Sequence, residues 1–335
     1  MGQTSLFCGS SMRNLRPLSF LFLAGIAAFS CQALNAQLSP RSEPNKLGFS
    51  FSNECVLSSD AELRGSDTAY RKVAIQDLSW TLSQAIPLRG NRTASVGLGY
   101  NFIHTAVEEP GRFDDKKGWS DFKQSHPKWN QLPVPSRLQS LAATLDYSQE
   151  VNERWSLSSS GSVGSYVTKS GLLSHGWGIT ASALGLYKWD PDLTLAVGAS
   201  YESLSTDFRF IPIVGFDWRL SDKWSMALGF PSTAVTYQMR KSLSLSIGLS
   251  GSGGVYYVKD DPQPGVAART LAGSRLETME ARLGFKVEWQ FNDTFSVNCT
   301  SGDILYREFK YIDRGYKLKS HDMVSFLSIG GSCSF

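Results

Sequence analysis

The stretch Thr278-Met279-Glu280-Ala281-Arg282-Leu283-Gly284-Phe285-Lys286-Val287-Glu288-Trp289-Gln290-Phe291 alternates between apolar and polar side chains. A period of two places alternate residues on opposite faces of a β-strand. The apolar face holds Met, Ala, Leu, Phe, Val and Trp, whereas the polar face carries Glu280, Arg282, Lys286 and Glu288. The stretch therefore predicts a long strand with one apolar and one charged face.

Similar alternation recurs along the chain after short polar turns. Six such segments open with an apolar residue, a Ser or Thr and another apolar residue, beginning at Ala94, Trp155, Leu193, Trp224, Leu243 and Phe295. Several continue for about ten residues, the length that a tilted strand needs to cross a bilayer. Together they predict an all-β fold, a transmembrane antiparallel up-and-down β-barrel of about 14 strands, with about 12 as the alternative. A soluble β-sandwich competes, since its solvated face would give the same charged row.

The expected strands are joined by connections of two kinds. We expect the strands at 46–56, 71–86, 94–106, 138–148, 154–168, 177–188, 193–203, 208–220, 224–230, 232–240, 242–258, 274–291, 294–309 and 321–335. Short connections rich in Asn, Asp, Gly and Pro alternate with longer ones, such as 57–70, 107–137 and 310–320. Short periplasmic turns and long external loops are typical of outer-membrane barrels.

The first 36 residues have the order of a secretory signal. Two arginines precede an apolar run from Leu18 to Phe29, and small residues lead to Ala33 and Ala36. We therefore expect a signal peptide at 1–36, cleaved after Ala33 or Ala36, and one barrel domain at 37–335. This predicts export to the outer membrane of a Gram-negative bacterium.

Aromatic residues flank the expected short turns at Trp155, Trp189, Trp218, Trp224, Trp289 and Phe295. Trp favours the bilayer interface because its ring is apolar while its N–H stays hydrated. The placement predicts a periplasmic aromatic girdle. Ordinary cross-strand pairs within hairpins are the alternative.

The segment from Ser325 to Phe335 alternates and ends the chain on an aromatic residue. It resembles the C-terminal signature of outer-membrane proteins, which the barrel-assembly machinery recognises. Gly331 and Cys333 depart from that signature, because larger apolar residues are usual at their positions. The resemblance implies that Phe335 is the assembly signal and that the assembly machinery and outer-membrane lipid are partners.

A central pattern consists of a Pro, Gly and Trp, a short turn, a second Trp and a Gly-x-Pro return, at Pro212, Gly215, Trp218, Trp224, Gly229 and Pro231. It resembles the core of an uncharacterised family of bacterial outer-membrane β-barrel domains. That family has no established activity, so the resemblance implies only fold and compartment. Proline lacks a backbone donor, so Pro212 and Pro231 are expected at strand ends or bulges.

Composition and motifs give little support for other chemistry. The net charge of +3 over 335 residues gives no reason to expect a nucleic-acid partner. Three of the four histidines follow a serine directly, at Ser125-His126, Ser174-His175 and Ser320-His321. All three pairs fall in expected loops or at strand ends, and neighbouring strand residues point to opposite faces, so no catalytic triad is expected. No His, Asp and Glu cluster has the spacing of metal ligands. The sequence thus predicts neither an enzyme nor a cofactor.

The leading expectation for function is passive transport of small solutes through a lumen lined by Glu280, Arg282, Lys286 and Glu288. A structural or surface-binding barrel with a closed lumen is the second possibility, and an outer-membrane hydrolase is the third. The loop at 107–137 combines charged and aromatic residues. A loop of that length is usually functional or disordered, and its aromatic residues favour packing into the barrel mouth.

Overall fold

A computed structural model describes residues 47–56, 62–64, 69–109, 133–168, 171–206, 209–230, 232–262, 270–320 and 322–335. The predicted signal peptide at 1–36 lies outside these ranges. The strands are β1 (Leu47–Val56), β2 (Glu62–Arg64), β3 (Ala69–Leu88), β4 (Arg92–Glu109), β5 (Arg137–Glu150), β6 (Trp155–Thr168), β7 (Trp177–Lys188), β8 (Leu193–Glu202), β9 (Phe210–Arg219), β10 (Trp224–Phe230), β11 (Ser232–Arg240), β12 (Leu243–Val258), β13 (Ser274–Gln290), β14 (Phe295–Tyr311), β15 (Tyr316–Ser320) and β16 (Val324–Ser334). A short 3-10 helix, η2 (Ile312–Arg314), follows β14.

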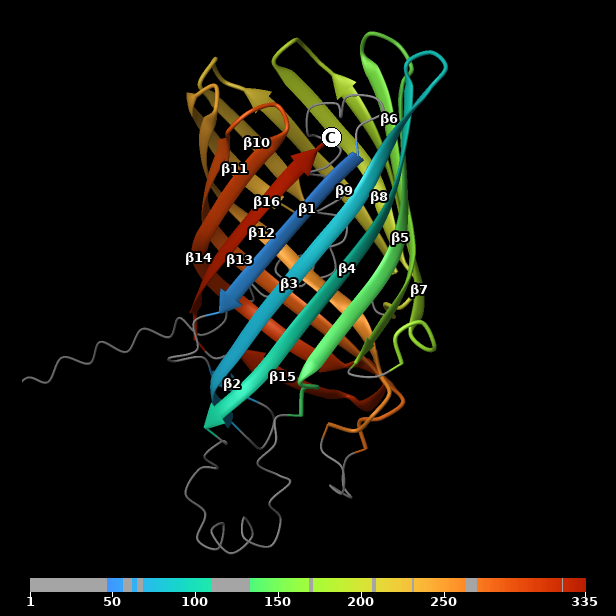
Figure 1. The fold of residues 1–335 in the computed structure, drawn as a ribbon, viewed down its shortest axis with the longest axis vertical. Coiled ribbons are helices and arrows are strands. Elements are labelled where there is room, and N and C mark those ends of the chain that lie inside the picture. The colour runs from blue at the N-terminus through green and yellow to red at the C-terminus, as the bar shows by residue number, and fades with distance from the viewer. Residues whose placement is uncertain are drawn as a thin grey trace, which may run out of the picture.

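Fourteen of these strands form a closed antiparallel barrel (Figure 1). The chain runs from β1 to β3 and then through consecutive neighbours to β14 and β16, and β16 pairs back with β1. Leu47 and Phe335 exchange backbone hydrogen bonds of 3.0 and 2.9 Å, so both ends of the barrel segment lie beside the short turns. The predicted fold is confirmed, with fourteen strands rather than twelve.

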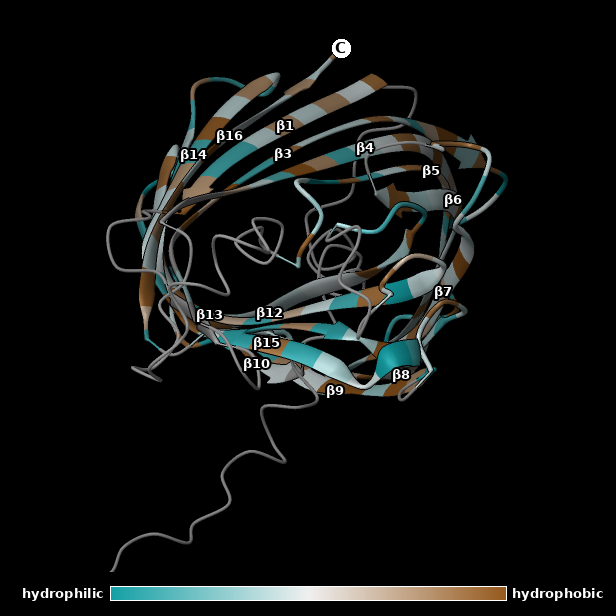
Figure 2. Ribbon diagram, turned by 90° about the horizontal axis from the view of Figure 1, so that it is seen from below, coloured by the Kyte–Doolittle hydropathy of each residue, from teal (hydrophilic) through white to brown (hydrophobic). Residues whose placement is uncertain are grey.

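The two faces of the wall differ in polarity. Figure 2 shows apolar and polar residues alternating along the strands. Large apolar side chains such as Phe51, Leu98, Leu145, Val197 and Phe285 are exposed on the outside. A closed barrel with an apolar outer belt fits a bilayer, because every strand edge is paired and the belt contacts lipid. This arrangement argues against the soluble sandwich.

None of the described residues forms a helix that is long and apolar enough to span a membrane.

Two segments expected as loops contain strands, so that part of the prediction is wrong. β2 lies within 57–70 and pairs with β3, while β15 lies within 310–320 and pairs with β14. β2 also pairs with β15. Segments this short carry too few residues to show a period of two. β2 and β15 continue the wall at the loop end, beyond the last residues of β1 and the first residues of β16 (Figure 1).

The barrel narrows toward its loop end. There β6 approaches β12 across the barrel, and Val167 pairs in parallel with Tyr257. With this contact, β2, β3, β4, β5, β6, β12, β13, β14 and β15 form a second closed ring, while β7 to β11 lie outside it. We call this nine-stranded part the loop-end ring. A ring of about eight strands is just wide enough for side chains to fill it.

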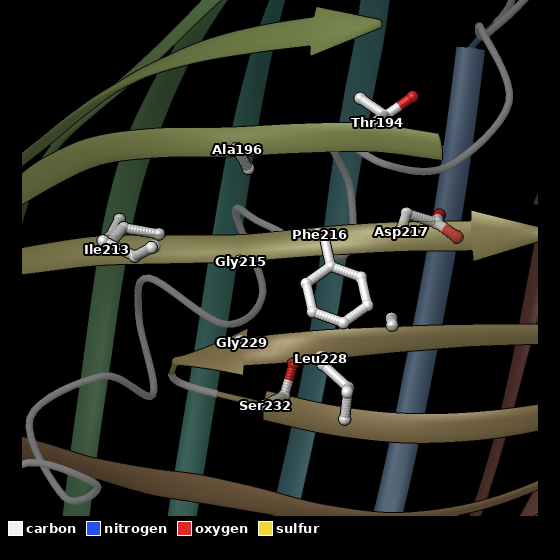
Figure 3. A pocket seen from close by; sticks show the side chains of 11 residues that line it. Thr194, Ala196, Ile213, Gly215, Phe216, Asp217, Leu228, Gly229 and Ser232 are labelled. Atoms are coloured by element: carbon white, nitrogen blue, oxygen red, sulfur yellow. The ribbon is translucent and has the colours of Figure 1, made fainter. Parts of the chain in front are cut away.

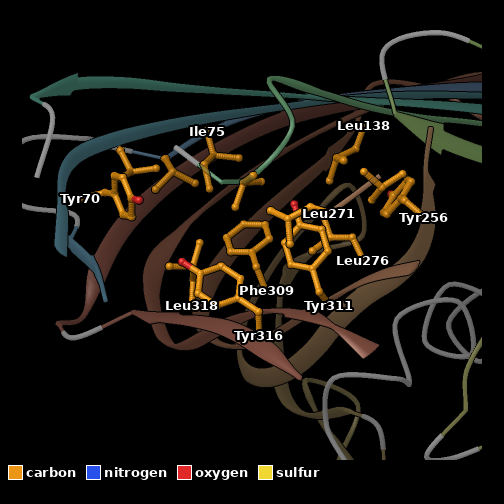
Figure 4. Close-up of a cluster of buried hydrophobic side chains, with 14 of the residues drawn as sticks. Tyr70, Ile75, Leu138, Tyr256, Leu271, Leu276, Phe309, Tyr311, Tyr316 and Leu318 are labelled. Carbon is orange, nitrogen blue, oxygen red and sulfur yellow. The ribbon is translucent and has the colours of Figure 1, made fainter. Parts of the chain in front are cut away.

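Apolar side chains fill the loop-end ring (Figure 4). Tyr311, Leu318, Leu276 and Leu138 come from its walls and Leu271 from the segment before β13, and all five are fully buried. Burying one such side chain stabilises the fold by roughly 1.5–3 kcal/mol. This loop-end core therefore occupies the interior of the loop-end ring with apolar side chains.

The described end of the longest loop contributes to the same core. Val134 is buried in it, and the Tyr311 hydroxyl donates to the Pro133 carbonyl. The Thr105 amide donates to the Ser136 carbonyl at 3.0 Å. Residues 133–136 thus pack against the loop-end core, whereas the aromatic residues on which the loop prediction rests lie at 110–132, outside the described ranges, so packing of the whole loop stays a prediction.

Candidate functional site

Between the loop-end core and the short turns, the wider fourteen-stranded section encloses a chamber lined by small polar side chains. Its interior positions are rich in Ser and Thr, including Ser50, Ser52, Ser79, Thr81, Ser158, Ser160, Ser162, Thr180, Ser244, Ser246, Ser296, Thr300 and Ser332. Hydroxyl groups bond across strands, for example Ser52 to Ser79 at 2.7 Å and Ser162 to Thr180 at 2.6 Å. These rows form because every second residue faces inward and the outward rows are apolar. The result is a hydroxyl-lined chamber, and we treat it as the candidate site.

A buried ionic cluster lies where the chamber meets the loop-end core. The Arg282 guanidinium donates to Glu54 Oε2 at 2.6 Å and, through Nε, to Glu280 Oε2 at 2.8 Å. Arg307 Nε donates to Glu280 Oε1 at 2.5 Å. β1 and β13 are separated in the wall by β16 and β14, so the contact between Glu54 and Arg282 crosses the concave interior. Arg282 also lies over the Phe326 ring at 5.3 Å.

The structure separates the four predicted lumen residues into two groups. Glu280 and Arg282 belong to the buried cluster. Lys286 and Glu288 form a separate ion pair of 2.6 Å, with 41% and 44% of their side chains exposed. Their exposure on an interior-facing row shows that solvent reaches this part of the chamber. A role in conduction stays a prediction for all four.

Sequence reasoning missed Glu54 and Arg307. Glu54 was detectable, because it is the one charged residue on the polar row of its alternating strand. Arg307 was not, because a bulge at Leu305 shifts the register. Ile304 pairs with Arg282, and Arg307 pairs with Glu280, so both face the interior despite their odd spacing.

The central motif lies on the hairpin of β9 and β10. Gly215 pairs with Gly229, and a Cβ atom at either position would lie within 3 Å of the facing backbone. Pro212 pairs with Ala199 of β8 but lies beyond the end of β10. On the β10 side, the backbone N–H that proline lacks would have no strand to donate to. Pro231 lies outside the described residues. Local backbone structure thus explains why glycine occurs at positions 215 and 229 and proline at position 212.

Because the paired glycines lack side chains, the inner wall is hollowed beside them (Figure 3). The hollow is lined by Thr194, Ala196, Ile213, Val214, Gly215, Phe216, Asp217, Ala227, Leu228, Gly229 and Ser232. Asp217 is the charged residue among them. We call this depression the glycine hollow.

Replacing Gly229 with Ala should destabilise the barrel by about 1–3 kcal/mol, because the added methyl group would overpack the β9–β10 contact. Its Cβ would lie 2.9 Å from Gly215 Cα and 2.9 Å from the Val214 carbonyl oxygen. The loss would be measured by gel electrophoresis of samples heated to different temperatures, as a fall in the temperature at which the folded band is converted into the unfolded band. Gly99→Ala is the matched control, since its nearest neighbour would be Thr81 Cγ2 at 3.5 Å. An equal response of both variants would contradict the explanation.

The predicted girdle residues flank the short turns and remain exposed, with Trp189 at 65%. Several of them also pair with rings across the strands. Trp155 lies 4.8 Å from Tyr187, and Trp224 lies 4.8 Å from Tyr237. Pairing and exposure occur together, so a position at the bilayer interface stays a prediction for Trp155, Trp189, Trp218, Trp224, Trp289 and Phe295.

At the loop end, Arg275 ties two connections together. Its guanidinium bonds to Asp313 of η2 at 2.7 Å and donates to the Leu204 carbonyl at 3.1 Å. The hydrogen bond from Arg275 lowers the pKa of the Asp313 carboxyl, which favours its charged form. Leu204 follows β8, so this contact holds the β8–β9 connection against the loop-end ring.

Of the three Ser-His pairs in the sequence, Ser174-His175 is the pair in which the structure describes both residues. Ser174 Oγ and His175 Nδ1 lie 2.8 Å apart, a contact that the opposite-face argument did not anticipate because these residues are in a loop. His175 also stacks on Tyr257 at 5.8 Å. His126 and His321 lie outside the described residues. Within the described ranges, no group of three or more His, Cys, Asp or Glu could hold a metal ion.

Comparison with known proteins gives one family match. A family model described as "Domain of unknown function (DUF6268)" matches residues 120–323, and a search of curated proteins found no match. An outer-membrane channel from Pseudomonas putida F1 has a TM-score of 0.46 and 9% identity, covering 88% of this chain and 97% of that chain. The P. putida toluene transporter TodX has a TM-score of 0.41 and 10% identity, with coverages of 88% and 91%. The KdgM porin has a TM-score of 0.34 and 8% identity, with coverages of 85% and 99%. Likenesses this weak carry no argument about function.

Proposed function

Because the chain belongs to the DUF6268 family, whose function is unknown, we infer its activity from the geometry of the barrel. We propose that the protein is a gated outer-membrane channel for small solutes. The observation that carries the proposal is the change along the barrel axis. A hydroxyl-lined chamber enclosed by fourteen strands meets a nine-stranded ring filled with apolar side chains. The chamber would be the passage and the loop-end core its gate.

The compartment follows from the wall and from the sequence. A closed antiparallel barrel with an apolar belt is the form in which outer-membrane proteins span lipid. The export signal predicted at 1–36 and the terminal Phe335 support delivery by the barrel-assembly machinery. Membrane fractionation should place the protein in the outer membrane, with heat-modifiable gel mobility.

The seams of the loop-end ring support the idea of a gate. Among the described residues, the ladder between β6 and β12 consists of the single pair Val167 and Tyr257, and the Lys259 amide just after β12 donates to Thr168 Oγ1 at 3.3 Å. β2 and β15 are joined through Lys319 with Arg64 and Ser320 with Leu63. β2 and β3 share three paired positions and β14 and β15 share four, whereas the ladders among β3 to β6 and among β12 to β14 are much longer. The two seams have the fewest paired positions, so they are where the ring can separate while the fourteen-stranded wall stays closed.

The packed core itself favours a second candidate, a structural or surface-binding barrel whose lumen stays closed. The hydrolase has less support, because a catalytic triad needs an acidic residue to orient the imidazole, and within the described ranges no acidic side chain is seen hydrogen-bonded to His175. The channel and the closed barrel would have the same fourteen-stranded wall. The two differ in whether the loop-end ring ever opens.

Recording purified protein in planar bilayers separates these candidates. A gated channel should show discrete openings in which current scales with salt concentration. A protein that is inserted and heat-modifiable, yet remains silent over a wide range of voltage, would favour the closed barrel. Heat-unfolded protein added at the same concentration is the control for leakage that detergent causes.

A further inference from the structure

The charges on the chamber wall do not balance. We count the interior-facing side chains that the structure describes and leave out the first and last residue of each strand. The carboxylates are Glu54, Asp77, Asp146, Asp217, Glu280 and Glu288, and the basic groups are Arg282, Lys286 and Arg307. Six acidic groups therefore face three basic ones.

Each basic group already has an acidic partner. Arg282 bonds to Glu54 and Glu280, and the side chain of Arg307, which is 4% exposed, bonds to Glu280. Lys286 pairs with Glu288. A passing anion would have to displace these carboxylates, so the basic groups offer it little attraction.

None of the other three carboxylates forms a direct ion pair among the described residues, and Arg282 acts on Asp77 only through a longer-range electrostatic interaction. Asp77 accepts a hydrogen bond from Asn101 Nδ2 at 2.6 Å. Asp146 accepts hydrogen bonds from Ser95 Oγ at 3.0 Å and from Ser160 Oγ at 2.5 Å. Asp217 lies in the glycine hollow beside Thr194. Neutral donors hold Asp77 and Asp146 in place, and these donors do not form ion pairs with the two carboxylates.

The three groups are spread around the wall rather than gathered at one point. Asp77 is on β3, Asp146 on β5 and Asp217 on β9, so carboxylates without a direct ion-pair partner lie over a wide arc of the chamber. Walls of one sign concentrate counter-ions inside a cleft, and rings of Asp or Glu are used by cation channels.

Basic residues at the turn end do not offset this field. Arg219 is paired with Asp192 at 2.6 Å, and their side chains are 60% and 51% exposed. Lys188 and Arg240 are the last residues of their strands and lie at the open rim. Water and salt screen charges at such positions within about 10 Å at ordinary ionic strength.

We infer that the chamber selects for cations, so that the solutes of this channel are small inorganic or organic cations rather than anions. This inference rests on the proposed channel function and deepens it by naming the charge class of the solute. Asp146 and Asp217 are the specificity-determining residues, because they are partly exposed in the wide section of the chamber.

The test is the reversal potential in planar bilayers across a gradient of potassium chloride. The wild-type channel should pass K⁺ more readily than Cl⁻. In the variant Asp146→Asn/Asp217→Asn the ratio of the two permeabilities should fall by about two-fold or more, because lumen charges set selectivity. Uptake of tetramethylammonium against that of acetate into liposomes gives a second readout for organic solutes.

Asp303→Asn is the matched control. This Asp lies on β14 opposite Leu283, whose side chain is exposed on the outer face, and it accepts a hydrogen bond from Ser325, so its loss should leave selectivity unchanged. Openings with no preference for K⁺, or an unchanged ratio in the double variant, would overturn the inference alone. Silence in both the wild type and the gate variant Tyr311→Ala/Leu318→Ala would overturn the proposed function and the inference with it.

Discussion

Replacing Tyr311 and Leu318 with Ala should convert rare openings into a steady conductance, with an increase in open probability of about ten-fold or more, since each 1.4 kcal/mol lost by the closed state shifts the equilibrium ten-fold. Both side chains are fully buried in the loop-end core. Large-to-small changes in a core cost about 2–5 kcal/mol each. The closed state alone depends on this packing, so it loses more stability than the open state does.

The experiment needs proof that the variant barrel is folded and a control substitution on the outer, lipid-facing side of the wall. Heat-modifiable mobility shows whether the double variant has assembled, and the single variant Leu318→Ala provides a milder opening if it has not. Leu283→Ala removes the same kind of side chain from the outer face and should leave conductance at the wild-type level. A folded double variant that stays silent would remove the core from gating and would favour the closed structural barrel.

The second large effect is expected at the ionic cluster, where Arg282→Met should destabilise the barrel by about 3–5 kcal/mol. The change removes the basic partner of Glu54 and leaves Glu280 with Arg307 alone. A carboxylate left in a buried site without its partner keeps its desolvation cost, which exceeds the value of the lost contact. Urea unfolding, followed by tryptophan fluorescence in the presence of lipid vesicles, would measure the change.

Lys286→Met is the control on the same strand. Its ion pair with Glu288 is largely exposed, and such pairs contribute about 0–1 kcal/mol. The double variant Glu54→Gln/Arg282→Met should recover most of the lost stability, because the stranded carboxylate becomes neutral while Glu280 keeps Arg307. A similar loss in Arg282→Met and Lys286→Met, or no recovery in the double variant, would contradict the burial argument.

Alternation predicted most of the wall. The bounds of β7, β10 and β11 agree with the sequence-based ranges 177–188, 224–230 and 232–240. The period is strong there because one face contacts lipid and the other faces a polar chamber. β2 and β15 were missed because three and five residues cannot establish a period.

The site was predictable only in part, because its contacts are not local. Arg282 was found from its own strand, but its partner Glu54 is 228 residues away in the sequence. The contact between β6 and β12 leaves no trace in the alternation of either strand. The bulge at Leu305 also shifts the inward-facing positions of β14 from even to odd residue numbers, so strict alternation assigns the residues after it to the wrong face. Such features depend on how the whole wall closes.

The two seams of the loop-end ring also constrain the order of folding. β2 with β3, and β14 with β15, are local hairpins that can form early. The seam between β2 and β15 joins segments from near the two ends of the barrel, so it can form only once β1 and β16 have been brought together. The loop-end core must then condense last, after the strands are already in the membrane. Closure of the loop-end ring therefore depends on prior closure of the fourteen-stranded wall, although the ring shares most of its strands with that wall.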